Sequence, residues 1–169
     1  MRPVYVSAAV FLVLAALFIA FVLSSASSLP PTVATHFSGR GYPNAWMAAS
    51  SYVTFIIAFG VGLPLLMAIA FYVVRWLPAS LINLPRKDFW LAPERLPETR
   101  RYLFSRGLWL GCTALLLMLG VHYTVVRANQ LTPPHLAPKS AVLLLIVFLV
   151  ALAVWMITFV RHFLRARPA

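Results

Sequence analysis

The sequence predicts an all-α fold, an integral membrane four-helix bundle. Four apolar runs, at about residues 4–23, 52–74, 107–126 and 140–160, contain no Asp, Glu, Lys or Arg. Each run is long enough to cross a bilayer as a helix, which takes about 20 residues. Because a backbone in hydrocarbon must satisfy its own hydrogen bonds, we expect the runs to be helical. The connections are too short for a separate soluble core, so residues 1–169 are expected to form a single transmembrane domain.

The basic residues flank the four runs, and they are unevenly distributed between the two sides. If both termini lie on one side, that side holds 11 Lys and Arg residues and the other holds 3. The larger set is Arg2, Arg75, Arg86, Lys87, Arg95, Arg100, Arg101, Arg106, Arg161, Arg165 and Arg167, and the smaller set is Arg40, Arg127 and Lys139. The positive-inside rule then predicts that both termini are cytoplasmic. Such a face would attract anionic lipids, and the absence of a basic groove or helix speaks against a nucleic-acid partner.

The individual runs differ in how we expect them to pack. The first is longer than the apolar core of a signal peptide and is predicted to be a retained span. The third opens with Gly107 and Gly111, a small-residue spacing that lets a helix of this chain or of another protein approach closely. The fourth is bulkier, as Leu143 and Trp155 illustrate. This bulk favours a peripheral or lipid-facing position for the fourth run.

The connection between the first two runs, residues 24–50, is predicted to be a short ordered extracytoplasmic loop. Residues 32–37 are β-prone, and the sequence Ser-Gly-Arg-Gly at 38–41 is typical of a turn, because glycine tolerates positive φ. Phe37, Tyr42 and Trp46 supply large aromatic side chains. We therefore expect this loop to pack on the bundle or on a partner.

Two motifs in the connections carry a resemblance to a known family. The first comprises Leu29, Pro30, Val33, His36, Phe37, Gly41, Pro43 and Trp46, and the second Asn83, Leu84, Pro85, Lys87, Trp90, Leu91, Ala92, Pro93, Glu94 and Arg95. With this spacing, about the first three spans resemble the amino-terminal domain of bacterial SdpI-type immunity proteins. The chain has Ala34 where that family commonly has proline, and Asn44 where it commonly has an acidic residue. The resemblance implies a bacterial cytoplasmic membrane protein that acts in immunity or signal relay at the envelope.

The sequence contains no strong catalytic or cofactor-binding motif. It has no G-x-S-x-G elbow, no H-E-x-x-H zinc motif and no phosphate-binding glycine loop. On the predicted topology His36, His122 and His135 could converge on a transition metal, and His122 could ligate a haem or chlorin. The favoured alternative is that His36 makes a hydrogen bond within its loop and His122 makes an interfacial or interhelical one. We therefore expect no resident metal or cofactor.

These observations favour a non-enzymatic multi-pass membrane protein of the SdpI immunity-like class. Its first outer loop is expected to bind a partner or an extracytoplasmic ligand, and its basic inner loop is expected to lie on the lipid surface. The predicted binding residues are His36, Phe37, Arg40, Tyr42, Asn44 and Trp46, and those predicted to fix the inner loop are Trp90, Glu94 and Arg95. The alternative is an accessory structural subunit of a larger respiratory or photosynthetic membrane complex, in contact with other subunits. A transporter is disfavoured because the spans carry no charge.

Overall fold

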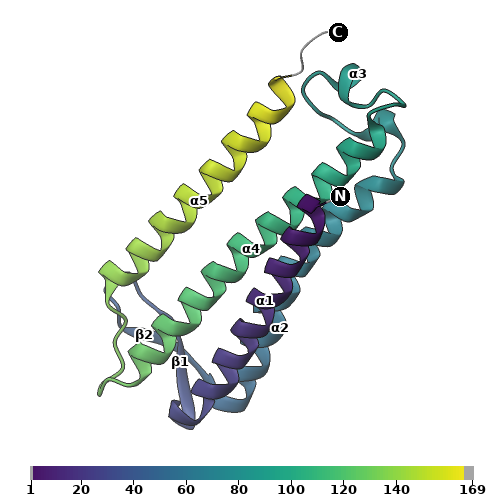
Figure 1. Cartoon of the computed structure of the whole chain (residues 1–169). Coiled ribbons are helices and arrows are strands. Elements are labelled where there is room, and N and C mark those ends of the chain that lie inside the picture. The colour runs from purple at the N-terminus through teal and green to yellow at the C-terminus, as the bar shows by residue number, and fades with distance from the viewer. Residues whose placement is uncertain (1, 166–169) are drawn as a thin grey trace.

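The computed structural model describes residues 2–165, and within this range four helices are long and apolar enough to cross a membrane (Figure 1). The long helices are α1 (Arg2–Ser25), α2 (Ala49–Val73), α4 (Leu96–Asn129) and α5 (Pro138–Leu164). The short elements are η1 (Ala26–Ser28), β1 (Thr32–Phe37), β2 (Pro43–Ala48), η2 (Val74–Trp76), η3 (Ala79–Leu81) and α3 (Lys87–Trp90). The four long apolar helices that the sequence predicts are confirmed. A small two-stranded sheet of β1 and β2 adds to the predicted all-α fold.

The helix α4 is longer than the apolar run inside it. It begins at Leu96, with Pro97 in its first turn, whereas the apolar run begins at Gly107. Proline suits a first turn because its missing N–H would have no intrahelical partner there. Arg100 and Arg101 continue the helix, since arginine is a good helix former. The basic residues therefore end the apolar run without ending the helix.

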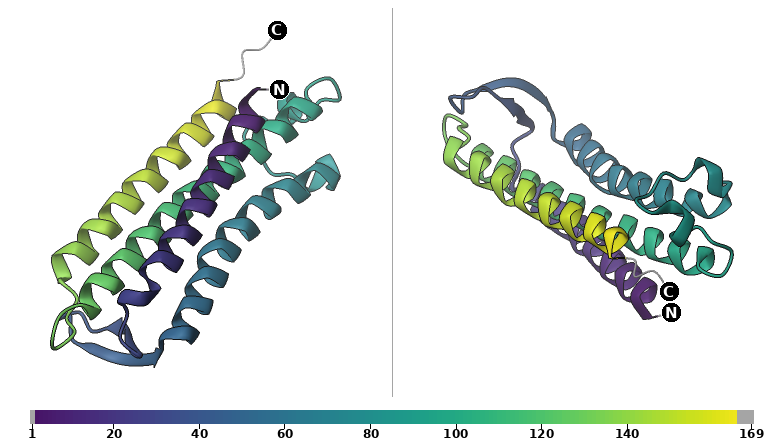
Figure 2. Two further views of the ribbon diagram at one scale, coloured as in Figure 1. Left: turned by 60° about the horizontal axis from the view of Figure 1, so that its bottom comes forward. Right: turned by 90° about the horizontal axis from the view of Figure 1, so that it is seen from above.

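The central element of the bundle is α4, which packs against α1, α2 and α5 (Figure 2). A Cβ atom added at Gly107 would lie 2.4 Å from the Cβ of Phe71 on α2. One added at Gly111 would lie 2.7 Å from the Cε2 of Phe11 on α1. Both distances are shorter than carbon atoms tolerate, so the missing side chains allow close approach. Both glycines thus lie at contacts within this chain.

The apolar core lies between α1, α2 and α4. Phe18 of α1 is fully buried, and it fills the space beside Gly60 of α2, where an added Cβ would lie 2.5 Å from its Cζ. Leu115 of α4 is 1% exposed in the same cluster. These three helices therefore form one closely packed unit.

The helix α5 is peripheral, as its bulk predicts. Of its residues, all of which the structure describes, Trp155 and Phe163 are the buried ones. Two sets of hydrogen bonds attach it to the rest of the chain. The indole N–H of Trp90 donates to the carbonyl of Phe163 at 2.9 Å, and Arg106 donates to the carbonyl of Trp155 at 2.6 Å. The remaining surface of α5 is largely apolar and exposed.

The two ends of the bundle differ in the elements that they carry. Both β1 and β2 lie at one end, which we call the hairpin end. The other end, which we call the loop end, carries α3 and the connection formed by residues 74–95. The helix α1 begins toward the loop end, and α5 finishes there (Figure 1).

Candidate functional site

The candidate site is the β-hairpin, residues 32–48. Its two strands are antiparallel, and its turn is closed by two backbone hydrogen bonds. The N–H of Gly41 donates to the carbonyl of Ser38 at 2.8 Å, and the N–H of Ser38 donates to the carbonyl of Tyr42 at 2.8 Å. Gly41 has a φ of 85°, a conformation that other residues rarely adopt. The extended segment and the turn predicted for this loop are confirmed.

Asn129, in the last turn of α4, holds β1 against the bundle. The N–H of Ala34 donates to its Oδ1 at 2.8 Å, and its Nδ2 donates to the carbonyl of Ala34 at 2.9 Å. Its Nδ2 also donates to the carbonyl of Val125 at 2.9 Å. Asn129 and Ala34 are both buried. Their hydrogen bonds therefore replace those that the backbone of β1 would otherwise make to water. One side chain thus takes the role that a neighbouring strand plays in a larger sheet.

The turn of the hairpin is attached to the connection between α4 and α5. The N–H of Leu136 donates to the carbonyl of Gly41 at 2.9 Å. A Cβ added at Gly41 would lie 2.1 Å from the carbonyl oxygen of Leu136, so only glycine fits this approach. Beside it, the rings of Tyr42 and His135 meet edge to face, with centroids 5.2 Å apart. The hairpin is therefore fixed at two places along its length.

A buried histidine links three helices beneath the hairpin. His122 of α4 is fully buried, and both of its ring nitrogens have partners. Its Nε2 lies 2.7 Å from Oγ of Ser25 on α1, and its Nδ1 lies 2.9 Å from the hydroxyl of Tyr52 on α2. The Ser25 hydroxyl also lies 2.9 Å from the carbonyl of Phe21. The interhelical hydrogen bond predicted for His122 is confirmed.

One assignment of protons satisfies every group in this chain of hydrogen bonds. Tyr52 donates to Nδ1 of His122, Nε2–H donates to Ser25, and Ser25 donates to the carbonyl of Phe21. In this arrangement the serine hydroxyl gives its proton to the backbone and not to the imidazole. The geometry is that of a polar contact that joins helices, where an unpaired group would be costly.

The three histidines considered as metal ligands are not brought together. His36 forms a short hydrogen bond through Nδ1 to Oδ1 of Asn44, which confirms the loop hydrogen bond predicted for it. His135 lies against Tyr42, and both nitrogens of His122 are occupied. Residues 2–165 contain no group of three or more His, Cys, Asp or Glu side chains placed to hold a metal ion.

Most of the predicted binding residues are exposed on the hairpin. Tyr42 is 63% exposed and Trp46 is 49% exposed. His36, Arg40 and Asn44 are exposed as well. Phe37 is the exception, because it is half-buried and packs against the core between the helices. The hairpin therefore offers its polar and aromatic side chains from a fixed backbone.

A cavity of about 320 Å³ lies beside β1, between α4 and α5. Its lining includes His36 and Phe37 of β1, Leu117 and Val121 of α4, and Leu144 of α5. The lining is mainly apolar, and His36 supplies a polar group. A cavity of this kind suits an apolar side chain or acyl segment of a ligand that also contacts the hairpin.

The predicted inner-loop residues lie together at the loop end. Trp90 donates to the carbonyl of Phe163, and its own carbonyl accepts a hydrogen bond from the Thr99 hydroxyl at 2.8 Å. The guanidinium carbon of Arg95 lies 3.7 Å from the centroid of the Phe89 ring. Glu94 is exposed. Trp90 thus joins α3 to both α4 and α5.

Comparisons with known proteins leave the resemblance to the SdpI-type family as a prediction. Neither a protein-family model, nor a curated protein, nor a solved structure gives a significant match to this chain. The functional argument therefore depends on the contacts described above.

Three residues whose side chains hold this site were not assigned that role from the sequence. Asn129 binds β1, and the hydroxyls of Ser25 and Tyr52 bind His122. A partial signal exists, because Asn129 follows His122 by seven residues and so lies on the same face of α4. That spacing places both polar side chains on the face toward α1, α2 and β1.

Proposed function

We propose that this chain is a non-enzymatic multi-pass membrane protein of the SdpI immunity-like class, which binds a partner or an extracytoplasmic ligand through its β-hairpin. One observation carries the proposal. Hydrogen bonds to Asn129 and Leu136 fix the backbone of the hairpin, while Tyr42 and Trp46 remain exposed. Exposed aromatic residues on a rigid element are typical of binding surfaces, because little conformational entropy is lost on association.

The proposed topology places the hairpin outside the cytoplasm. The loop end carries Arg75, Arg86, Arg95 and the start of α4, and the 11 to 3 distribution of basic residues favours a cytoplasmic position for that end. We assign the protein to the bacterial cytoplasmic membrane, where this rule holds and where the resemblance would place it. The basic loop end then faces the anionic lipids of the inner leaflet.

The chemistry of the surface suggests what binds there. Tyr42 and Trp46 each combine an apolar ring with a hydrogen-bond donor, and Arg40 adds a positive charge at the turn. The cavity beside His36 and Phe37 would accept an apolar group of the same ligand. The surface fits an amphipathic peptide or the extracytoplasmic part of a membrane protein better than a small polar molecule.

Photocrosslinking in native membranes tests this proposal. A photoreactive phenylalanine at position 42 is expected to form a protein adduct, and combining it with His36→Ala and Trp46→Ala should abolish the adduct with little change in melting temperature. Trp76→Ala is the matched control, because Trp76 is 63% exposed at the opposite end. Equal losses of adduct and of stability would show that His36 and Trp46 only pack the hairpin.

The same experiment separates the alternatives. Adducts with lipid alone would make the hairpin a membrane anchor and would contradict the proposal. An adduct with cofactor-bearing subunits, with visible absorption in the purified material, would support an accessory subunit instead. A partner adduct at position 42 that persists in Trp76→Ala and is lost with His36→Ala and Trp46→Ala supports binding by the hairpin.

A further inference from the structure

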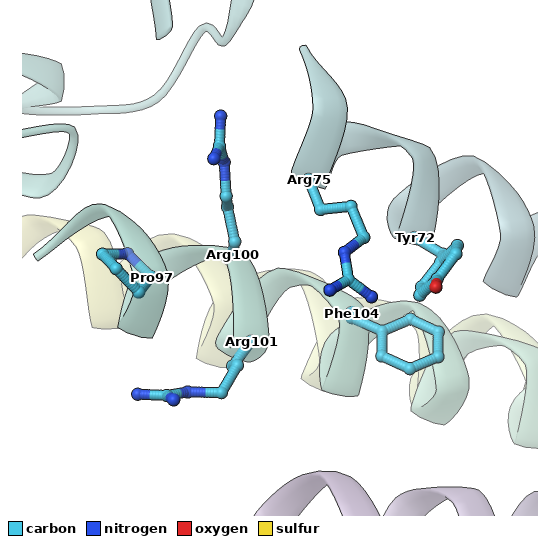
Figure 3. Close-up of a pocket in the computed structure, with 6 residues that line it drawn as sticks. All are labelled: Tyr72, Arg75, Pro97, Arg100, Arg101 and Phe104. Carbon is cyan, nitrogen blue, oxygen red and sulfur yellow. The ribbon is translucent and has the colours of Figure 1, made fainter. Parts of the chain in front are cut away.

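A cavity of about 340 Å³ lies at the loop end, between α2 with η2 and the first turns of α4. It is lined by Tyr72, Arg75, Pro97, Arg100, Arg101 and Phe104. Figure 3 shows Arg75 extending from η2 toward α4, beside the rings of Tyr72 and Phe104, while Arg100 and Arg101 project from α4. These six lining residues include three guanidinium groups and no carboxylate.

The arginines of this cavity are held mainly by neutral groups. The guanidinium carbon of Arg75 lies 4.8 Å from the ring centroid of Tyr72 and 5.5 Å from that of Trp76. Stacking on a ring leaves the N–H groups at the guanidinium edge available for an anion. Arg100 donates to the carbonyl of Leu77 at 2.8 Å, but its buried Nε has no hydrogen-bond partner among the described residues.

An anion would offset the positive charge of this arrangement. Three positive groups around one cavity repel one another, so the cavity favours a ligand that carries negative charge. A phosphate group carries negative charge and several acceptor oxygens that match the geometry of guanidinium donors. The chemistry of the cavity therefore favours a phosphate monoester or diester.

The position of the cavity along the helices indicates the source of that phosphate. Arg75 follows directly on the uncharged run that ends at Val74, and Arg101 lies within two helical turns of Gly107, where the next uncharged run begins. If α2 and α4 cross a membrane, these arginines lie at the level of the lipid headgroups. The aromatic walls formed by Tyr72 and Phe104 lead from there toward the hydrocarbon.

We propose that this cavity binds the phosphate group of an anionic glycerophospholipid. Arg75 contacts the phosphate, the exposed side chain of Arg101 turns toward it, and Arg100 borders it. Tyr72 and Phe104 pack against the glycerol and the first part of an acyl chain. The inference depends on the membrane-spanning arrangement of the proposed function but not on the hairpin surface. Failure of hairpin crosslinking would therefore leave it intact, and the reverse also holds.

Native mass spectrometry of the purified full-length chain tests the site. Titration with phosphatidylglycerol is expected to show one retained lipid, and phosphatidylcholine with the same acyl chains should be retained much less. Arg75→Gln and Arg101→Gln should each weaken phosphatidylglycerol binding about fivefold, as expected for one basic residue near an anionic lipid. Lys87→Gln removes the same charge outside this cavity and should change binding by less than about twofold.

Three results would overturn the proposal. Equal weakening by Lys87→Gln would mean that only the overall charge of the loop end matters. Equal weakening by Arg161→Gln, which alters a separate cavity lined by Trp90, Tyr102 and His162, would have the same meaning. Inorganic phosphate that binds with the same dependence on Arg75 and displaces the lipid would make this a site for soluble phosphate.

Folding controls keep the test decisive. Arg75→Lys retains the charge without the planar fork and should recover part of the affinity lost in Arg75→Gln. Arg101 is exposed, so its replacement should leave the melting temperature unchanged. If Arg75→Gln lowers the melting temperature, the phosphatidylglycerol affinity of Arg101→Gln is the measurement that tests the site. Undiminished lipid binding by a folded Arg101→Gln variant would contradict the assignment.

Discussion

The hairpin end and the loop end of this molecule use different chemistry to fix a connection to the bundle. At the hairpin end, neutral polar side chains are buried and their donors and acceptors pair, as in Asn129 with Ala34 and His122 with Tyr52. At the loop end, partly exposed arginines contact backbone carbonyls and aromatic rings, and the Nε atoms of Arg100 and Arg106 have no hydrogen-bond partner among the described residues. The comparison indicates a rigid platform at one end and a charged surface at the other.

This difference has a physical origin in the different costs of burying a neutral polar group and a charged group. A neutral amide or imidazole can be buried at modest cost when it is fully hydrogen-bonded, whereas a guanidinium cannot be buried without an anion or a polar neighbour. The hairpin end therefore gains more stability from each polar contact. The loop end gains little stability from its arginines, whose charge stays partly exposed.

The largest expected effect comes from Asn129→Ala. This change leaves the buried N–H and carbonyl of Ala34 without partners, and each such group costs about 1–3 kcal/mol. We expect the free energy of unfolding, measured by denaturation with SDS in mixed micelles, to fall by about 3 kcal/mol. Hydrogen exchange at the Ala34 amide should accelerate strongly.

Gln130→Ala is the control, because Gln130 is the exposed next residue and contacts Arg127. It should change stability by no more than about 0.5 kcal/mol. An Ala34 amide that stays protected in Asn129→Ala would show that the hairpin does not depend on this side chain.

A smaller effect is expected at His122. His122→Phe keeps the aromatic volume but removes the bonds to Ser25 and Tyr52, and interhelical hydrogen bonds in membranes contribute about 1–2 kcal/mol in favourable cases. Tyr52→Phe should cost less in the native protein. In the His122→Phe background it should be neutral or stabilising, because it removes a buried hydroxyl that has lost its partner.

A double-mutant cycle measures this coupling directly. Additive losses in the double variant would mean that Tyr52 and His122 do not interact energetically, and the proposed role of the buried histidine would be wrong.

The smallest effect is expected at the loop end, in Arg106→Met. Arg106 donates to the carbonyl of Trp155 and to the hydroxyl of Thr158, which are helical groups of α5 that keep their own helical hydrogen bonds. Methionine avoids the cost of desolvating the guanidinium, so stability should change by less than about 1 kcal/mol. A loss larger than that of Asn129→Ala in the same assay would reverse the comparison between the two ends.

Much of the fold is predictable because its signals are local. The four long helices follow from uncharged runs of sufficient length, and the strand at residues 32–37 and the turn at 38–41 follow from β-prone residues and glycine. The start of α4 could not be placed from hydropathy, because Arg100 and Arg101 end the apolar run but not the helix. The hydrogen bonds expected for His36 and His122 were predictable in kind, although their partners were not.

Local sequence predicts the four long helices, the positions of the charges and the aromatic residues that the hairpin carries. The packing of the folded chain brings Asn129 to Ala34 and His122 to Ser25, pairs separated by 95 and 97 residues. Hydropathy and turn preference depend on neighbouring residues, whereas these bonds depend on the rotation and depth of one helix against another. Close contacts such as those at Gly60 and Gly111 set that rotation, and they exist only once the helices pack.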